Sequence, residues 1–286
     1  MTGWVIRDIA DYDEARRCVD FQRTIWGADF GEIVPAAILW VVGRNGGVVA
    51  GAFEGDALVG FLFGLTGLRD RQLVHWSDML AVSPAARGRG IGQALKRYQR
   101  QRLLDAGISL CNWTFDPLEA RNAHLNFARL GVTSAQYVRD CYGTSDSPLH
   151  RGLPTDRLIV DWLVASPRVR ERMDAAIPPA EPAHPPVAAS PEPAPQPVPA
   201  ETSRDPAMAR AINPCGGEPR LDLEDSTLRL LIPPRIRELA ETDPDAALQW
   251  RHRTRAAFEA YFGRGYRAME VEPAADGLYA YVLRSG

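Results

Sequence analysis

The chain has 286 residues, a formal net charge of −3 at pH 7, and ordinary fractions of apolar (45%) and charged (24%) side chains. This length suits two domains or one large one. The slight acidic balance argues against a general nucleic-acid binder, which needs a cationic excess. The sequence shows no secretory signal and no apolar run long enough to span a membrane, and its four cysteines form no CxxC pair. We therefore expect a cytoplasmic protein with reduced thiols and no metal site.

Strand and helix patterns alternate through the first part of the chain. A strand at 4–9 is followed by a helix at 11–27 capped by Asp11, a short helix with Pro35 in its first turn, and a hairpin at 48–65. The predicted elements that follow are a strand at 72–84, a helix ending near Asp105, a strand at 108–115, a helix at 117–131, and strands at 134–143 and 156–164. A βαβ unit within a largely antiparallel set predicts an α/β fold with a mixed sheet.

Residues 176–206 are dominated by proline and alanine. Eleven of the 23 prolines of the chain lie between residues 177 and 206. Such a segment has few backbone donors and little apolar surface to bury, so the composition predicts a stiff, disordered linker. A recognition motif for a proline-binding partner is the less favoured interpretation. The linker separates a domain at 1–175 from a smaller unit at 207–286.

The C-terminal unit contains one predicted strand (227–234), one helix (243–265) and a hairpin (266–273 and 277–284). These elements are too few for a stable sheet of their own, so we expect the unit to dock on the first domain or on a partner chain. Tyr261 precedes Gly265 by the same four residues that separate Phe127 from Gly131. This spacing suggests a degenerate copy of the helix–strand–strand half of the first domain. A chance match is the alternative, because helices commonly end at glycine.

A glycine-rich loop, Arg87-Gly88-Arg89-Gly90-Ile91-Gly92, lies between a predicted strand and a predicted helix. The first backbone N–H groups of a helix have no partners within it, and the helix dipole adds positive potential at the same point. Because glycine leaves these amides accessible, the loop predicts a phosphate-binding site. It lacks the Gly-Lys-Ser/Thr ending of a P-loop and the GxGxxG spacing of a dinucleotide fingerprint. A glycine turn without a ligand is the weaker alternative.

This loop resembles the [Q/R]-x-x-G-x-[G/A] motif of the GNAT superfamily of acyl-CoA-dependent N-acyltransferases. The resemblance covers roughly residues 1–165, with a strand before the loop and a basic helix after it. Asn122 and the pair Gly131-Val132 are similar to a later helix of the superfamily. Phe127 departs from the pattern, since a tyrosine that protonates the leaving thiolate is common at its position. The chain looks like a subgroup in which some relatives N-acylate, including N-succinylate, amino acids.

The resemblance implies acetyl-CoA or another acyl-CoA as co-substrate, and no metal. The implied contacts are the strand backbone before the loop, the loop with the first helical turn, and two positions on the later helix: Leu80, Ala81, Val82, Arg87, Gly88, Arg89, Gly90, Ile91, Gly92, Gln93, Asn122 and Phe127.

N-acyl transfer also needs a base for the acceptor ammonium and donors for the developing oxyanion. Asp78, on the strand before the loop, is our first candidate base, and an ion-pair role is the alternative. His75 is the second candidate, with a solvated or capped histidine as the more common outcome. Tyr142 and Tyr137 are candidate acids, with sheet packing as the alternative. We expect Asp116 to cap the following helix.

We predict that the protein transfers an acetyl or succinyl group from coenzyme A to the amine of a small molecule, for which an amino acid is a candidate. Arg121, Arg139 and Arg157 are then candidates for binding its carboxylate. A non-catalytic acyl-CoA-binding or sensing module is the alternative, and Phe127 favours it. We expect no nucleic-acid or membrane partner, and a homodimer remains an option.

Overall fold

The computed structural model describes residues 3–28, 30–143, 152–174 and 210–286. The linker predicted at 176–206 lies outside these residues.

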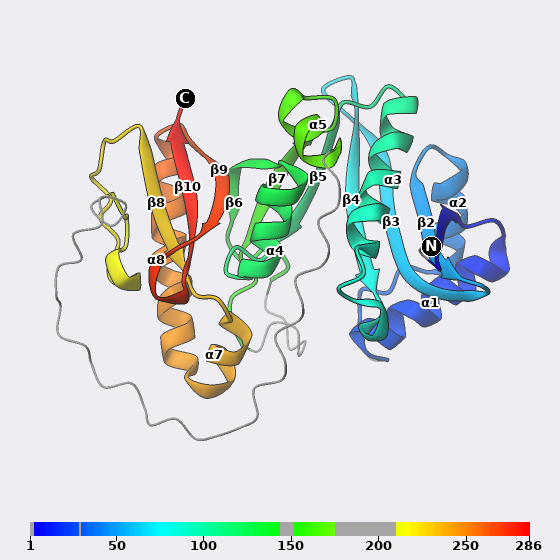
Figure 1. The fold of residues 1–286 in the computed structure, drawn as a ribbon, viewed down its shortest axis with the longest axis horizontal. Coiled ribbons are helices and arrows are strands. Elements are labelled where there is room, and N and C mark those ends of the chain that lie inside the picture. The colour runs from blue at the N-terminus through cyan, green and yellow to red at the C-terminus, as the bar shows by residue number, and fades with distance from the viewer. Residues whose placement is uncertain (1–2, 29, 144–151, 175–209) are drawn as a thin grey trace.

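Ten strands of the described residues form one mixed sheet, in the order β1-β2-β3-β4-β5-β7-β6-β9-β10-β8 (Figure 1). This confirms the predicted α/β class with a mixed sheet. The strands are β1 (Val5–Asp8), β2 (Val48–Glu54), β3 (Ala57–Arg69), β4 (Gln72–Val82), β5 (Leu110–Phe115), β6 (Thr133–Val138), β7 (Arg157–Leu163), β8 (Thr227–Ile232), β9 (Tyr266–Pro273) and β10 (Tyr279–Ser285).

The α-helices are α1 (Tyr12–Trp26), α2 (Ala36–Arg44), α3 (Ile91–Asp105), α4 (Ala120–His124), α5 (Pro167–Asp174), α7 (Ile236–Thr242) and α8 (Pro244–Gly263). Asp11 caps α1 as predicted, because its side chain accepts a hydrogen bond from the Glu14 amide. Pro35 is the N-cap of α2 rather than a residue of its first turn. The sequence analysis missed α5 and α7, which are too short and too polar to show a helical apolar period.

The helix predicted at 117–131 begins three residues later, and only its first five residues are α-helical. Residues Leu125–Leu130 form a π-helical turn that ends at Gly131, where φ is +75°. A positive φ is easily adopted only by glycine, which explains why the turn ends there.

Two apolar layers hold the sheet. In β3, Phe61 and Phe63 point toward α1 and α2, whereas Leu62 points into the core on the side of α3. This alternation follows from the two-residue period of a strand. The larger core continues without a break from α3 to α8, and Phe127, Phe258 and Tyr281 all belong to it.

Residues 227–285 repeat the connectivity of residues 110–163. In each segment a strand is followed by helical residues (α4 and a π-helical turn in the first, α7 and α8 in the second) and then by two further strands. The last strand lies between the other two, giving β5-β7-β6 and β8-β10-β9. The two segments meet edge to edge in the middle of the sheet, where β6 runs antiparallel to β9 and Ser134 lies opposite Ala268.

A single offset of 134 residues relates the two segments around this meeting point. It maps Gly131 onto Gly265, and both glycines have positive φ at the end of a helical segment. It maps Ser134 onto its cross-strand partner Ala268. It also maps the strand bulge between Ser134 and Gln136 onto the one between Ala268 and Glu270. Equivalent residues that pair with each other are the mark of a local two-fold axis.

Candidate active site

Strands β4 and β5 are paired over only part of their length. Val74, His75 and Trp76 pair with Leu110–Asn112, and among the described residues no further pair joins the two strands. Beyond Trp76, β4 stays with β3, while β5 stays with β7. One edge of residues 77–82 therefore lacks a strand partner. We call the region between this edge and residues 113–115 the β4–β5 split, and the predicted contact residues Leu80, Ala81 and Val82 lie on it.

The split begins at a bulge in β4. Gly64 lies opposite Ser77 and Phe63 lies opposite Met79, so Asp78 is the extra residue. A bulge bends its strand and increases the local twist, which is a physical reason for β4 to leave β5 here. The bulge also turns Asp78 outward between the buried residues Ser77 and Met79.

The glycine loop follows β4 directly and ends at the N-terminus of α3. Gly88 has φ +77° and Gly90, the N-cap of α3, has φ +79°. Both values are strained for any residue with a Cβ atom. No side chain caps this helix, and the first intrahelical bond, from the Ala94 amide to the Gly90 carbonyl, is 3.0 Å long. The amides of Ile91, Gly92 and Gln93 are thus available to an anion.

Two arginines flank these amides, and both are exposed. Arg87 donates from Nε to the Val82 carbonyl at 3.3 Å, and Arg89 forms an ion pair with Glu54 on β2. Exposed amides, a helix dipole and cationic side chains at one point form a site suited to a phosphate group.

A second group of residues lies on the other face of the sheet. Trp113 and Phe115 point into the core, so Thr114 between them points to the opposite face. Its Oγ1 is 2.8 Å from the Tyr142 hydroxyl, and the Arg157 guanidinium lies 5.2 Å from the centroid of the Tyr142 ring. Asp78 is near enough to Tyr142 for its charge to act on the phenol. We call these four residues (Asp78, Thr114, Tyr142 and Arg157) the Tyr142 cluster.

The pKa of Asp78 is raised above its ordinary value. The main cause is partial removal of the carboxyl group from water, and the charge of Glu32 acts in the same direction. A hydrogen bond with the Trp76 side chain acts against them. Although Asp78 reaches solvent, its carboxylate is therefore more basic than that of a fully solvated aspartate.

The pKa of Tyr142 is also raised, mainly by burial and in part by the Asp78 charge, whereas Arg157 lowers it. The phenol therefore keeps its proton at neutral pH. The split therefore carries a carboxylate of raised pKa and a phenol that keeps its proton, the two kinds of group that general acid–base chemistry uses.

His75 lies outside this cluster. Only 1% of it is exposed, and it occupies the α3 side of the sheet. Its Nδ1 is 3.0 Å from Thr66 Oγ1 and its Nε2 is 3.0 Å from Gln99 Nε2. Burial and the nearby Lys96 lower its pKa to about 4. Both ring nitrogens are engaged away from the split, so neither is placed to take a proton from an acceptor there.

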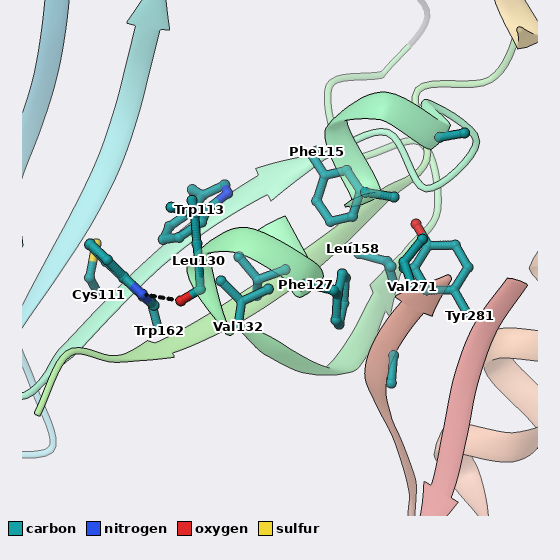
Figure 2. Packing of buried hydrophobic residues seen from close by; sticks show 14 of the residues in the cluster. Cys111, Trp113, Phe115, Phe127, Leu130, Val132, Leu158, Trp162, Val271 and Tyr281 are labelled. Carbon is teal, nitrogen blue, oxygen red and sulfur yellow. Dashed lines mark hydrogen bonds between the residues drawn. The ribbon is translucent and has the colours of Figure 1, made fainter. Parts of the chain in front are cut away.

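Phe127 is fully buried and packs edge-on against Phe115 and Tyr281 (Figure 2). Its ring belongs to the core, so the structure gives it a packing role and no exposed surface for a ligand. Asn122, one turn earlier, is exposed and accepts a 3.4 Å hydrogen bond from Asn126. Of the two helix positions that the resemblance implied, only Asn122 is accessible.

Tyr137 does not join the Tyr142 cluster either, because its hydroxyl donates to the buried Asp156. Asp116 accepts a 2.9 Å hydrogen bond from the Leu118 amide and so caps the turn at 116–119. It is not the expected helix N-cap, because α4 begins at Ala120 and its N-cap is Glu119. Thr114 and Trp76 are the site residues that the sequence analysis missed. Neither belongs to a motif, and only the strand pairing brings them to the split.

The described residues contain no group of three or more His, Cys, Asp or Glu side chains able to hold a metal ion. None of their helices is both long and apolar enough to cross a membrane.

Comparison with known proteins identifies a family for part of the chain. Residues 15–131 match the model of the acetyltransferase (GNAT) family. This segment includes the strand that carries Asp78, the glycine loop, α3 and α4.

Several solved structures are similar over 55–57% of this chain and nearly all of their own length. One is a GNAT-family acetyltransferase from Streptococcus pneumoniae (14% identity, 98% of that chain, TM-score 0.46). Others are the ribosomal-protein-S18-alanine N-acetyltransferase from Escherichia coli (15%, 95%, 0.44) and an Arabidopsis thaliana protein in complex with acetyl-CoA (16%, 99%, 0.43). No curated protein matches the sequence.

Proposed function

Because residues 15–131 form a GNAT acetyltransferase domain, we propose that this protein transfers an acyl group from an acyl-CoA to the amine of a small molecule. Acetyl and succinyl are the candidate groups, and an amino acid is the candidate acceptor. The observation that carries the proposal is the position of the glycine loop. It directly follows the unpaired edge of β4, and it ends at the uncapped N-terminus of α3, where backbone amides are available to a ligand.

The two faces of the split suggest where each substrate binds. The pyrophosphate of the acyl-CoA fits the amides of Ile91–Gln93, with Arg87 and Arg89 beside it. The extended arm of the acyl-CoA fits the unpaired edge of Leu80–Val82, because backbone groups there can pair with its amides. This arrangement brings the thioester to the bulge at Asp78, and the acceptor amine reaches it from the face of the Tyr142 cluster.

Asp78 then takes a proton from the acceptor ammonium, directly or through one water molecule. The neutral amine attacks the thioester carbon, and backbone N–H groups of β4 stabilise the oxyanion. As the carbon–sulfur bond breaks, Tyr142 donates its proton to the leaving thiolate, and the proton released by the acylated nitrogen returns to Tyr142 through solvent. Asp78 then releases to solvent the proton that it took from the ammonium. Tyr142 thus takes the role for which Phe127 has no suitable atom.

The proposal is tested by measuring the release of free thiol from acetyl-CoA and succinyl-CoA with a panel of amino acids and simple amines. Calorimetric titration with each acyl-CoA runs in parallel. We expect binding of both and turnover with at least one amine. Binding without turnover on any amine favours the sensing alternative. Absence of acyl-CoA binding contradicts both hypotheses.

We also propose a domain organisation. The common strand order, the shared offset of 134 residues and the antiparallel meeting of Ser134 with Ala268 support residues 207–286 as a degenerate copy of the second half of the GNAT-like domain at 1–175. The copy closes the β6 edge of that domain, a place that a second subunit would otherwise be able to occupy.

A further inference from the structure

The turn between β5 and α4, residues 116–119, is held by three side chains of the C-terminal unit. Arg251 on α8 donates from Nη2 to Asp116 Oδ2 at 2.6 Å. Tyr281 on β10 donates from its hydroxyl to the Pro117 carbonyl at 2.8 Å, and Arg237 on α7 forms an ion pair with Glu119. The turn directly follows Thr114 and Phe115, so its position bears on the split.

The Arg251 side chain has no exposed surface, and Asp116 is the one carboxylate among the described residues with which it forms an ion pair. A buried guanidinium is stable only beside a counter-charge, so the two groups fix each other. The Tyr281 hydroxyl is buried as well. The Tyr281 ring packs edge-on against Phe127 (Figure 2) and against Phe258.

Asp116 also lies beside the Tyr142 cluster. Arg157 Nη1 is 4.0 Å from Asp116 Oδ2, the same oxygen that accepts from Arg251. The Arg157 guanidinium lies by the Tyr142 ring, and Thr114, two residues before Asp116, holds the Tyr142 hydroxyl. Asp116 is therefore a carboxylate between two arginines, one from the C-terminal unit and one from the cluster.

We propose that Arg251 is a positioning residue of the acyl-transfer site. By holding Asp116 and the turn at 116–119, it keeps Arg157 beside the Tyr142 ring and Thr114 within reach of the Tyr142 hydroxyl. Without Arg251, Asp116 retains Arg157 as its nearest cation and draws it away from the ring. The proposal rests on the proposed function through the role of Tyr142. Under this proposal the C-terminal unit contributes directly to the geometry of the acyl-transfer site.

The test compares Arg251→Met, Arg251→Lys and Tyr281→Phe with the control Glu270→Gln in the full chain. Glu270 forms ion pairs with Arg168 and Arg172 across the same interface but does not contact the turn. We expect Arg251→Met to lower kcat about 10- to 100-fold, because small displacements of catalytic groups have effects of this size. KM for the acyl-CoA should change less than about two-fold, since the phosphate site is on α3.

Two further results are expected. Arg251→Lys lowers kcat less than Arg251→Met does, because lysine keeps a positive charge beside Asp116. Tyr281→Phe also lowers kcat, but less than Arg251→Met. Hydrogen exchange at the amides of residues 116–119 becomes faster in Arg251→Met and Tyr281→Phe but not in Glu270→Gln. Exchange is measured without any acceptor, so it tests the positioning even if no amine is turned over.

The proposal is overturned if Arg251→Met is folded and exchanges at 116–119 as the wild type does. It is also overturned if Glu270→Gln lowers kcat as strongly, because the effect then follows general stability. If Arg251→Met does not fold, kcat and hydrogen exchange at residues 116–119 are measured in Tyr281→Phe instead. Values equal to those of the wild type then overturn the proposal. Failure of the proposed function appears separately, as a wild-type protein that shows no turnover.

Discussion

At the scale of single residues, the position of Asp78 in a strand bulge determines which way its side chain points and how much water reaches its carboxylate. At the bulge the Asp78 side chain lies on the face of the Tyr142 cluster and reaches solvent, whereas its neighbours Ser77 and Met79 are buried. Partial loss of water raises its pKa. His75, three residues earlier in the same strand, points to the other face and becomes a buried, neutral hydrogen-bonding group. Two candidates that look alike in sequence are separated by strand alternation.

Replacing Asp78 by Asn should lower activity and raise stability at the same time. We expect kcat to fall about 10²-fold or more, as for the loss of a general base. In the wild type, the pKa of Asp78 is raised on folding, so its charged form destabilises the folded state above that pKa. The variant should therefore have a higher free energy of unfolding at pH 7.

The gain in stability should shrink as the pH falls toward the ordinary pKa of aspartate, because the wild-type group is then protonated in both states. Denaturant titrations at several pH values, together with pH–rate profiles, check both parts. A variant that is as active as the wild type contradicts the role of Asp78 as base. Equal stability at pH 7 contradicts its desolvation.

At the scale of elements, the start of α3 combines the glycine turn with the surface proposed to bind the acyl-CoA. Gly88 and Gly90 supply positive φ, and the uncapped helix supplies free amides. Gly92 differs from both, since it lies within the helix, has no positive φ, and has Val82 Cγ2 at 3.8 Å as the nearest neighbour of an added Cβ atom. The three glycines of the motif therefore do not have equal roles.

Replacing Gly90 by Ala should weaken acyl-CoA binding about 10-fold or more and lower the free energy of unfolding by about 1–2 kcal/mol, because an L-residue is strained at this φ. Gly92→Ala is the matched comparison, because Gly92 has no positive φ. Its affinity should fall less than that of Gly90→Ala, and its stability should stay equal or rise by up to about 1 kcal/mol, since alanine favours helix. Calorimetric titration and thermal unfolding provide the measurements. Equal affinities of the two variants argue against a special role of the Gly90 conformation.

At the scale of the whole molecule, one sheet and one continuous core join segments that the linker separates in sequence. Arginine–carboxylate pairs cross the junction at several points. Arg168 and Arg172 bind Glu270, Arg255 binds Asp156, and Arg139 binds Glu259. The junction is thus both apolar and ionic, and we expect the two parts to unfold together.

Glu270→Gln should lower the midpoint of a single calorimetric transition without splitting it. Because Glu270 bonds to two arginines and is about three-quarters buried, the expected loss is about 1.5–3 kcal/mol. The arginines lower its pKa against the effect of burial. The stabilisation is therefore fully present above the ordinary glutamate pKa and is lost as the pH falls through the lowered value. Two separate transitions in the wild type contradict a single cooperative unit.

Local sequence alone determined most elements of this protein and the conformation of the glycine loop. Helix caps such as Asp11, strand alternation and the glycines of the loop act within a few residues of themselves, so their pattern is visible along the chain. Only the tertiary structure decided which candidates meet. The bulge at Asp78 depends on pairing with β3, Tyr142 reaches Thr114 across 28 residues, and Arg251 reaches Asp116 across 135. Contacts of this kind depend on how distant strands and helices pack together, and no local pattern encodes them.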